Sequence, residues 1–112
     1  MVEPEIVELY SLLRQHTLAL LELSRLERWD QVAAQAAAQA AVVEALQRAG
    51  ASPERLSPTA QAQVISWLAE ADAAQREAME RAEAGRRELS DTIVELEGTR
   101  VVSGRLAKAY GS

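Results

Sequence analysis

The sequence has no cysteine and no phenylalanine, and a single histidine among its 112 residues. Without cysteine, nothing in it points to an oxidising compartment. One histidine cannot supply an ordinary zinc site or the paired Glu-x-x-His motifs of a di-iron bundle. A glycine-rich phosphate loop is also missing, and no serine has an activating histidine or lysine at a suggestive spacing. We therefore expect no metal, no cofactor and no enzymatic activity.

Basic surface and long apolar runs are lacking as well. The net charge is −5 and the isoelectric point is about 4.9, which argues against nucleic acid as a partner. No apolar run approaches membrane-spanning length, so membrane insertion is not expected. The first residues, Met-Val-Glu-Pro-Glu, are acidic where a secretion signal would be basic. We expect a cytoplasmic protein.

What the sequence does contain is typical of a helical protein. Hydrophobic residues make up 48% of it, and alanine, leucine, glutamate and arginine dominate, as in helical bundles and coiled coils. The length suits one small domain spanning residues 1–112. We predict an all-α fold: an antiparallel bundle of three helices, the third very long, followed by a short C-terminal helix.

The first two helices are expected at about residues 4–24 and 29–49, joined by a short turn that makes them antiparallel. Each helix carries a heptad pattern. His16, the single histidine of the chain, and Trp29 are interpreted as structural residues. In the first helix the seam is Ile6, Leu9, Leu13, His16, Leu20 and Leu23. In the second helix it is Trp29, Val32, Ala36, Gln39, Val43 and Leu46.

The third helix is expected at about residues 58–97, because Ser57 is a good N-cap and Pro58 suits the first helical position. At 1.5 Å per residue it would span roughly 60 Å, about twice either earlier helix. Two shorter helices cannot cover a third helix of that length from end to end. The rest of its apolar surface must therefore be covered by something else. Gly98 and Thr99 then suggest a break, followed by a weakly amphipathic tail helix at about 99–110.

The candidate partner-binding residues lie on the long helix and in the tail. Trp67 and Leu68 are adjacent and cannot both point into one seam, which makes one of them a candidate for partner contact. A partner helix needs apolar anchors at i, i+3 or i+4 spacing, and Val64, Leu68 and Ala71 provide such a line. Apolar surface is also expected to remain uncovered at 89–96.

Two stretches of the sequence resemble the FliT family of flagellar export chaperones. One is the run Leu20-Leu-Glu-Leu-Ser-Arg-Leu-Glu-Arg-Trp-Asp30, and the other is the ending Leu106-Ala-Lys-Ala-Tyr-Gly111. The chain length and the order of the helices are similar too. Through this resemblance Trp67 and Leu68 match an aromatic-apolar pair of the family's third helix, and Tyr110 matches its tail tyrosine. Both places are implicated in partner contact in the family.

The resemblance implies a cytoplasmic chaperone that binds the C-terminal region of the filament-cap protein before export. It also implies contact with the flagellar export ATPase complex and, in some bacteria, with the master transcriptional regulator of flagellar genes. The family's C-terminal helix restricts access to the partner-binding face. The corresponding autoinhibitory residues here are Val101, Val102, Leu106 and Tyr110, and removing residues 99–112 is then expected to tighten partner binding.

Two other interpretations stay open. A chaperone for hook-associated proteins shares a long helical pair and a tyrosine-containing ending. A structural coiled coil would pair the long helix with a second copy of itself as a homodimer, although Gln75, Gly85 and Arg86 interrupt its seam.

Overall fold

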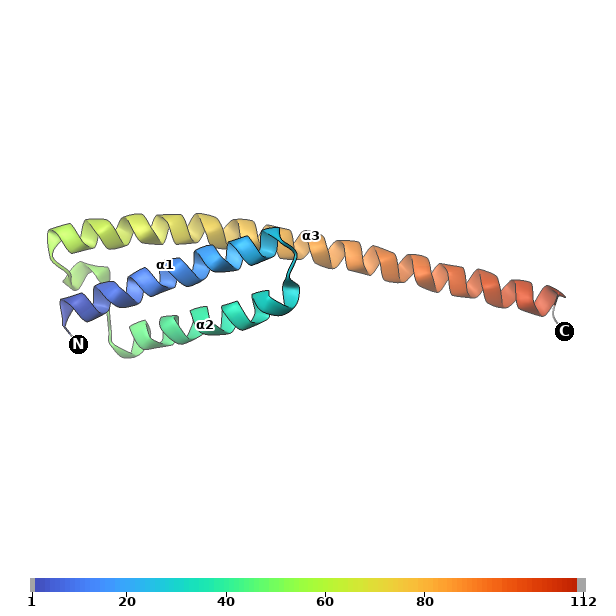
Figure 1. Cartoon of the computed structure of the whole chain (residues 1–112), viewed down its shortest axis with the longest axis horizontal. Helices are drawn as coiled ribbons and strands as arrows, with labels where there is room; N and C mark the ends of the chain where they lie inside the picture. The colour runs from blue at the N-terminus through green and yellow to red at the C-terminus, as the bar shows by residue number, and fades with distance from the viewer. Residues whose placement is uncertain (1, 111–112) are drawn as a thin grey trace. The chain divides into compact units, whose positions relative to one another are not determined.

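The computed structural model describes residues 2–110, and describes side chains for residues 2–98. It contains three α-helices, α1 (Glu3–Arg25), α2 (Trp29–Arg48) and α3 (Pro58–Tyr110), with a short 3-10 turn at Pro53–Arg55 (Figure 1). No strand occurs among the described residues, so the expected all-α class is confirmed. The chain divides into two compact units, Met1–Arg81 and Ala82–Ser112. We call them the bundle unit and the C-terminal unit and describe each by itself.

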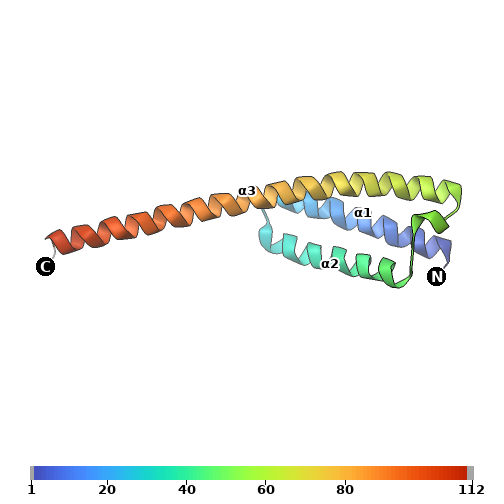
Figure 2. The ribbon, with the colours of Figure 1, turned by 180° about the vertical axis from the view of Figure 1, so that it is seen from behind.

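In the bundle unit, α1, α2 and the first part of α3 lie side by side (Figures 1 and 2). Arg14 and Arg25 of α1 form ion pairs with Glu70 and Glu77 of α3, in the same order along both helices. α1 and α3 are therefore parallel. α2 is antiparallel to both. Its C-terminal end packs with the first half of α1, since Leu46 and Tyr10 belong to one cluster.

Two hydrophobic clusters hold the bundle unit together. The larger one joins the beginnings of α1 and α3 to the end of α2 and the following loop, and its buried members are Tyr10, Val42, Leu46, Ala51, Leu56 and Val64. The smaller one, at the other end of the unit, consists of Leu20, Leu21, Ala74 and Ala78. Alanines contribute half of the second cluster, so close helix approach replaces large side chains there.

The line of α1 that is buried deepest carries hydroxyl groups. Tyr10, Thr17 and Ser24 are seven residues apart and are 7%, 1% and 1% exposed. Each hydroxyl donates a hydrogen bond to a backbone carbonyl: Tyr10 to Ala51, Thr17 to Leu13 and Ser24 to Leu20. These bonds offset the cost of burying polar groups. Burial also raises the pKa of the Tyr10 hydroxyl.

This line differs from the predicted seams. The sequence placed Leu9, Leu13 and Leu23 at the centre of the first seam, and the structure leaves them half-buried. In α2, Val42 is buried to 8% exposure whereas the predicted Val43 is 36% exposed. Leu20 and Leu46 of the predicted seams are buried, and Val32 and Ala36 pack against the smaller cluster, so the seams are correct in part and displaced by about one residue elsewhere. Two neighbouring helices on different sides decide which face is deepest, and local spacing does not contain that information.

The ends of the first two helices show one expected and one unexpected residue. Gly50 follows α2 with φ +57°, the left-handed conformation that favours glycine at this position. After α1 the same conformation falls on Glu27, also at φ +57°. The amide of Arg28 then donates to the carbonyl of Leu23 across the turn. A glutamate in this conformation costs about 1 kcal/mol relative to glycine.

Helix α3 begins as the sequence predicted and ends differently. Ser57 Oγ accepts the amide of Ala60, which makes it the N-cap, and Pro58 is the first helical residue. The carboxylate of Glu3 also accepts hydrogen bonds from Ser57, which joins the starts of α1 and α3. At the other end the helix continues through Gly98 to Tyr110. The break at Gly98 and Thr99 and the separate helix over 99–110 are therefore corrected, because one glycine at an uncrowded helix position is tolerated.

Candidate partner-binding surface

Two of the predicted partner-binding residues are core residues of the bundle unit. Val64 is 0% exposed and Ala71 is 7% exposed. Val64 belongs to the larger cluster, together with Tyr10 and Leu46. The predicted line Val64, Leu68 and Ala71 is therefore turned toward α1 and α2 and offers a partner little surface. The i, i+4, i+7 spacing was recognised correctly, but the bundle itself occupies that face.

Trp67 and Leu68 are both half-buried and pack against the larger cluster. Their exposed neighbour is Ile65, at 53%. Tyr110 lies outside the residues whose side chains are described, and so do the predicted tail residues Val101, Val102 and Leu106. The backbone of residues 99–110 is helical and continuous with α3, and the autoinhibitory role of the tail stays a prediction.

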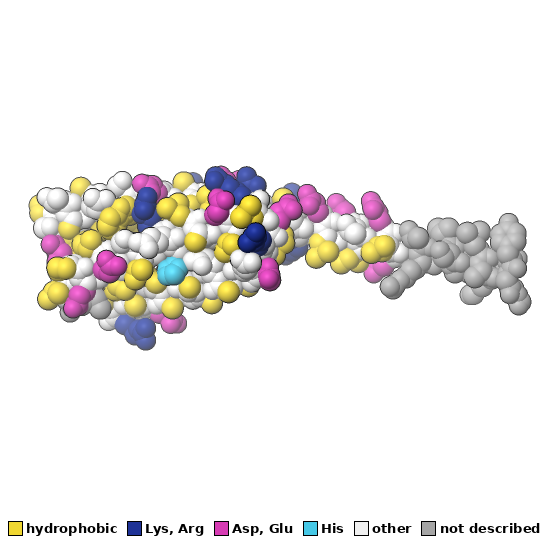
Figure 3. All heavy atoms as spheres, viewed as in Figure 1, with side chains coloured by type: hydrophobic (Ala, Val, Ile, Leu, Met, Phe, Trp, Pro, Cys, Tyr) yellow, Lys and Arg dark blue, Asp and Glu magenta, His cyan; other side chains and the backbone are white. Residues whose placement is uncertain are grey.

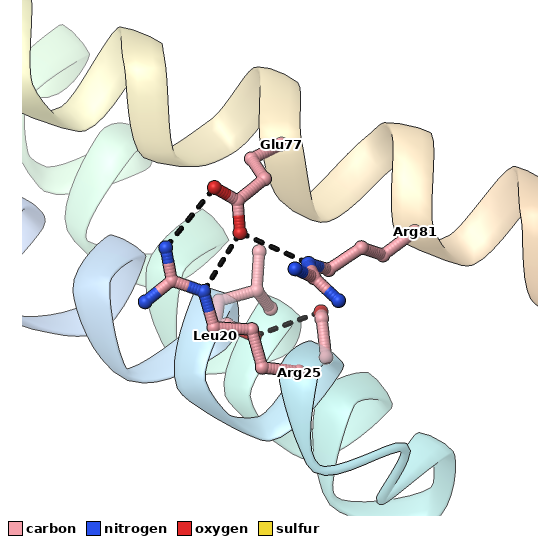
Figure 4. A network of polar contacts seen from close by, with 5 residues as sticks. Leu20, Arg25, Glu77 and Arg81 are labelled. Carbon is pink, nitrogen blue, oxygen red and sulfur yellow. Dashed lines mark hydrogen bonds and ion pairs between the residues drawn. The ribbon is translucent and has the colours of Figure 1, made fainter.

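An ionic cluster joins the end of α1 to the last part of α3 that belongs to the bundle unit (Figure 4). The guanidinium of Arg25 donates two hydrogen bonds to Glu77, at 2.7 and 3.0 Å. Arg81, one turn further along α3, donates a third at 2.9 Å. Hydrogen bonds from Arg25, and then from Arg81, lower the pKa of Glu77 to about 2. Charge-assisted bonds of this kind specify geometry well even where water screens their energy.

A polar layer joins all three helices at the middle of the bundle unit. The amide nitrogen of Gln39 in α2 donates to Thr17 in α1 at 2.8 Å and to Gln75 in α3 at 2.9 Å. Close by, Gln35 contacts the imidazole Nδ1 of His16 at 2.7 Å, so His16 is held by a hydrogen bond, as the sequence suggested. The same layer borders a hollow of about 230 Å³, which is lined by Leu13, Thr17, Gln39, Leu68, Ala71, Asp72 and Gln75.

The C-terminal unit has an uncovered apolar face. Leu89, Ile93 and Leu96 are 62%, 47% and 59% exposed. Their i, i+4, i+7 spacing places them on one side of the helix, and we call them the Leu89 face. Val94, at 63% exposure, lies on a different side. Hydrophobic side chains gather along one edge of this segment and acidic side chains along the other in Figure 3.

Most charged residues close in sequence to the Leu89 face are acidic. Residues 82–98 contain five acidic and two basic side chains. Both arginines are engaged by one carboxylate: Glu83 accepts Arg86 at 3.0 Å and Arg87 at 3.6 Å. These pairs lie within one helix at i, i+3 and i, i+4 spacing. The other acidic residues of this stretch are Glu88, Asp91, Glu95 and Glu97, and the sequence continues with the basic residues Arg100, Arg105 and Lys108.

An apolar groove lies between the start of α1 and the end of α2 in the bundle unit. Its volume is about 470 Å³, and it is lined by Pro4, Glu5, Glu8, Leu9 and Ala45. It is open to solvent, and sequence reasoning did not single it out, since its lining comes from two helices at unrelated positions.

Two features are absent from the described part of the chain. No group of three or more His, Asp or Glu side chains there could hold a metal ion. No helix in the same part combines the length and apolarity needed to cross a membrane.

Comparison of the chain with protein-family models, with curated proteins and with solved structures gives no match.

Proposed function

We propose that the chain is a helical binding protein that holds an amphipathic helix of a partner protein on the Leu89 face. The observation that carries the proposal is the exposure of Leu89, Ile93 and Leu96, at 47–62%, on one side of a helix. Helix-in-groove recognition uses apolar anchors at this spacing and needs no catalytic group. Full burial of a leucine or isoleucine side chain contributes about 1.5–3 kcal/mol, so half-exposed anchors can each gain about 1 kcal/mol.

The narrower form of the proposal is a flagellar export chaperone. The similarity of residues 20–30 and 106–111 to FliT-like proteins makes the C-terminal region of a filament-cap protein the first partner to test. In this role the protein would hold the cap protein in the cytoplasm, prevent its premature assembly and deliver it to the export ATPase complex. Binding to a transcriptional regulator of flagellar genes belongs to the same proposal. Hook-associated proteins are the alternative export substrates.

The test is calorimetric titration of the full chain with C-terminal peptides of a filament-cap protein and of a hook-associated protein. The variant Leu89→Ser/Leu96→Ser should weaken binding about tenfold or more, since two anchors of about 1 kcal/mol are lost. Val94→Ser is the matched control, because Val94 is equally exposed on another side of the same helix. Equal loss in both variants would remove the Leu89 face from the proposal. Binding of neither peptide would exclude the export-chaperone form.

A second candidate is self-association of the long helix. The same exposed face could be covered by another copy of the chain, as in a coiled-coil dimer. Sedimentation of the wild-type chain and of Leu89→Ser/Leu96→Ser separates the two functions. A dimer that dissociates in the variant would favour the coiled coil, whereas a monomer in both samples would exclude it.

A further inference from the structure

We infer that the groove between the start of α1 and the end of α2 anchors an arginine side chain of a partner protein. The groove has a volume of about 470 Å³ and is lined by Pro4, Glu5, Glu8, Leu9 and Ala45. It belongs to the bundle unit, so the inference does not depend on the Leu89 face or on the function proposed for that face. It comes from the combination of an apolar base with two carboxylates that have no cationic partner.

The groove has an apolar base and an acidic margin. Leu9 and Ala45 are half-buried, and Leu9 packs against the larger hydrophobic cluster. Glu5 and Glu8 are exposed and lie three residues apart, which places them on one side of α1 with about 5–6 Å between their Cβ atoms. An occupant must therefore present hydrocarbon to the base and hydrogen-bond donors to the margin.

Neither carboxylate of the groove has a cationic partner within the described residues. No ion pair there includes Glu5 or Glu8. The arginines of α1, Arg14 and Arg25, contact carboxylates of α3 at 2.6 and 2.7 Å. Both are therefore already compensated, and α1 itself does not neutralise the margin of the groove.

The acidic surplus at this end of the bundle unit does not depend on where the count stops. Residues 1–13 contain three acidic and no basic side chains, residues 31–57 contain two of each, and residues 58–69 contain neither. Arg48, the cation of α2 nearest in sequence to Ala45, lines a separate hollow together with Glu44. The helix dipoles largely cancel, because the positive start of α1 and the negative end of α2 both border the groove.

An arginine side chain matches both parts of the groove. Its aliphatic stem can lie on Leu9 and Ala45 while its charged head remains at the solvent-exposed margin. The guanidinium carries five donors in a fixed plane, so one group can bond to Glu5 and Glu8 together, which the point charge of lysine does less well. The volume of the groove also leaves room for an aliphatic residue beside the arginine.

The experiment titrates the full chain with two blocked tripeptides and follows methyl resonances by NMR. One peptide is acetyl-Leu-Arg-Leu-amide, and the other has citrulline in place of arginine, which keeps the shape and removes the charge. The arginine peptide should shift the methyl signals of Leu9 and Ala45 in a saturable manner. Its Kd should be at least about threefold lower than that of the citrulline peptide at about 50 mM salt, and the difference should shrink at about 500 mM.

Two charge variants locate the preference. Glu5→Gln/Glu8→Gln should bind the two peptides with equal affinity. Glu22→Gln/Glu80→Gln removes the same charge from exposed positions elsewhere in the bundle unit and should retain the preference for arginine. An equal reduction in both variants would show attraction to net charge alone and would overturn the inference. Equal affinity of the wild-type chain for the two peptides would overturn it as well.

Two further variants test the location of the site. Ala45→Leu fills the base of the groove and should abolish the shifts from both peptides, with the helical circular dichroism unchanged. Leu89→Ser/Leu96→Ser should bind both peptides as the wild type does. Unchanged binding in Ala45→Leu, or loss of binding in Leu89→Ser/Leu96→Ser, would place the peptides outside the groove and overturn the inference without touching the function proposed for the Leu89 face.

Discussion

Helix α3 runs through both units, and its two stretches differ in which side chains are buried and which are exposed. In the bundle unit it buries small residues: Ala71, Ala74 and Ala78 are 3–7% exposed. In the C-terminal unit the large residues Leu89 and Leu96 are about 60% exposed. Size and hydrophobicity alone would predict that the leucines are buried and the alanines are exposed. Small side chains are buried where neighbouring helices approach closely, and large ones are exposed where the structure describes no covering element.

The two units also differ in their polar contacts. In the bundle unit, ion pairs and amide bonds join different helices, as between Arg25 and Glu77 or between Gln39 and Gln75. In the C-terminal unit the ion pairs of Glu83 connect residues three or four apart. Contacts between helices specify a tertiary arrangement, whereas local pairs only support a helix. The polar contacts of the bundle unit therefore specify how its helices are arranged, and the pairs of Glu83 support only their own helix.

The largest expected effect comes from placing a charge in the bundle core. Val64→Asp should destabilise the bundle unit by about 3 kcal/mol or more, because no partner for a carboxylate exists at a fully buried position. Ile65→Asp is the control, since Ile65 is adjacent and 53% exposed, and it should change stability by about 0.5 kcal/mol or less. Urea unfolding monitored by the fluorescence of Trp29 and Trp67, both in the bundle unit, measures both. Similar losses in the two variants would contradict the assigned face of α3.

The next effect tests the close packing of alanines. Ala78→Leu should cost about 1–3 kcal/mol, because its site against Leu20 and Leu21 has no room for a larger side chain. Ala84→Leu, at an exposed position of the C-terminal unit, should be nearly neutral. Thermal unfolding followed by circular dichroism compares them. A neutral Ala78→Leu would mean that the helices can move apart freely.

A smaller effect is expected from the polar layer. Gln39→Ala removes hydrogen bonds to both Thr17 and Gln75 and should cost about 1 kcal/mol. Gln47→Ala, at an exposed position of the same helix, is the matched control. Denaturant midpoints at constant slope give the difference. If Gln39→Ala and Gln47→Ala have the same denaturant midpoint, the polar layer specifies the register of the helices without adding stability.

The smallest effect is the pH dependence of the ionic cluster. Because the pKa of Glu77 is lowered from the ordinary 4.5 to about 2, its stabilisation is present above about pH 4.5. It is lost as the pH falls toward 2. Glu77→Gln should therefore flatten this part of the bundle's stability profile, most visibly at low salt.

The control is Glu83→Gln, which alters pairs within the C-terminal unit. It should leave the acid dependence of the bundle signal unchanged. If Glu77→Gln and wild type lose stability in parallel between about pH 5 and pH 2, Glu77 does not join α1 to α3 in solution.

Sequence reasoning located the helices better than their contacts. Ser57 and Pro58 marked the start of α3, and Gly50 marked the end of α2, because capping chemistry is local. It also identified residues 89–96 as uncovered apolar surface. It placed Val64 and Ala71 on a partner face, and the bundle buries both. The error arose because an apolar line at helical spacing has the same appearance whether α1, α2 or another protein covers it.

By itself, the sequence determined that the chain forms helices and roughly where they begin and end, since helix propensity, caps and heptad period act over a few residues. Only the tertiary structure decided which side of each helix is inside. It placed the hydroxyl line Tyr10, Thr17 and Ser24 deepest in α1, where hydrogen bonds to backbone carbonyls satisfy the buried hydroxyl groups. It left Leu89, Ile93 and Leu96 exposed, because burial depends on which helices are near in space, and that is a property of the whole arrangement.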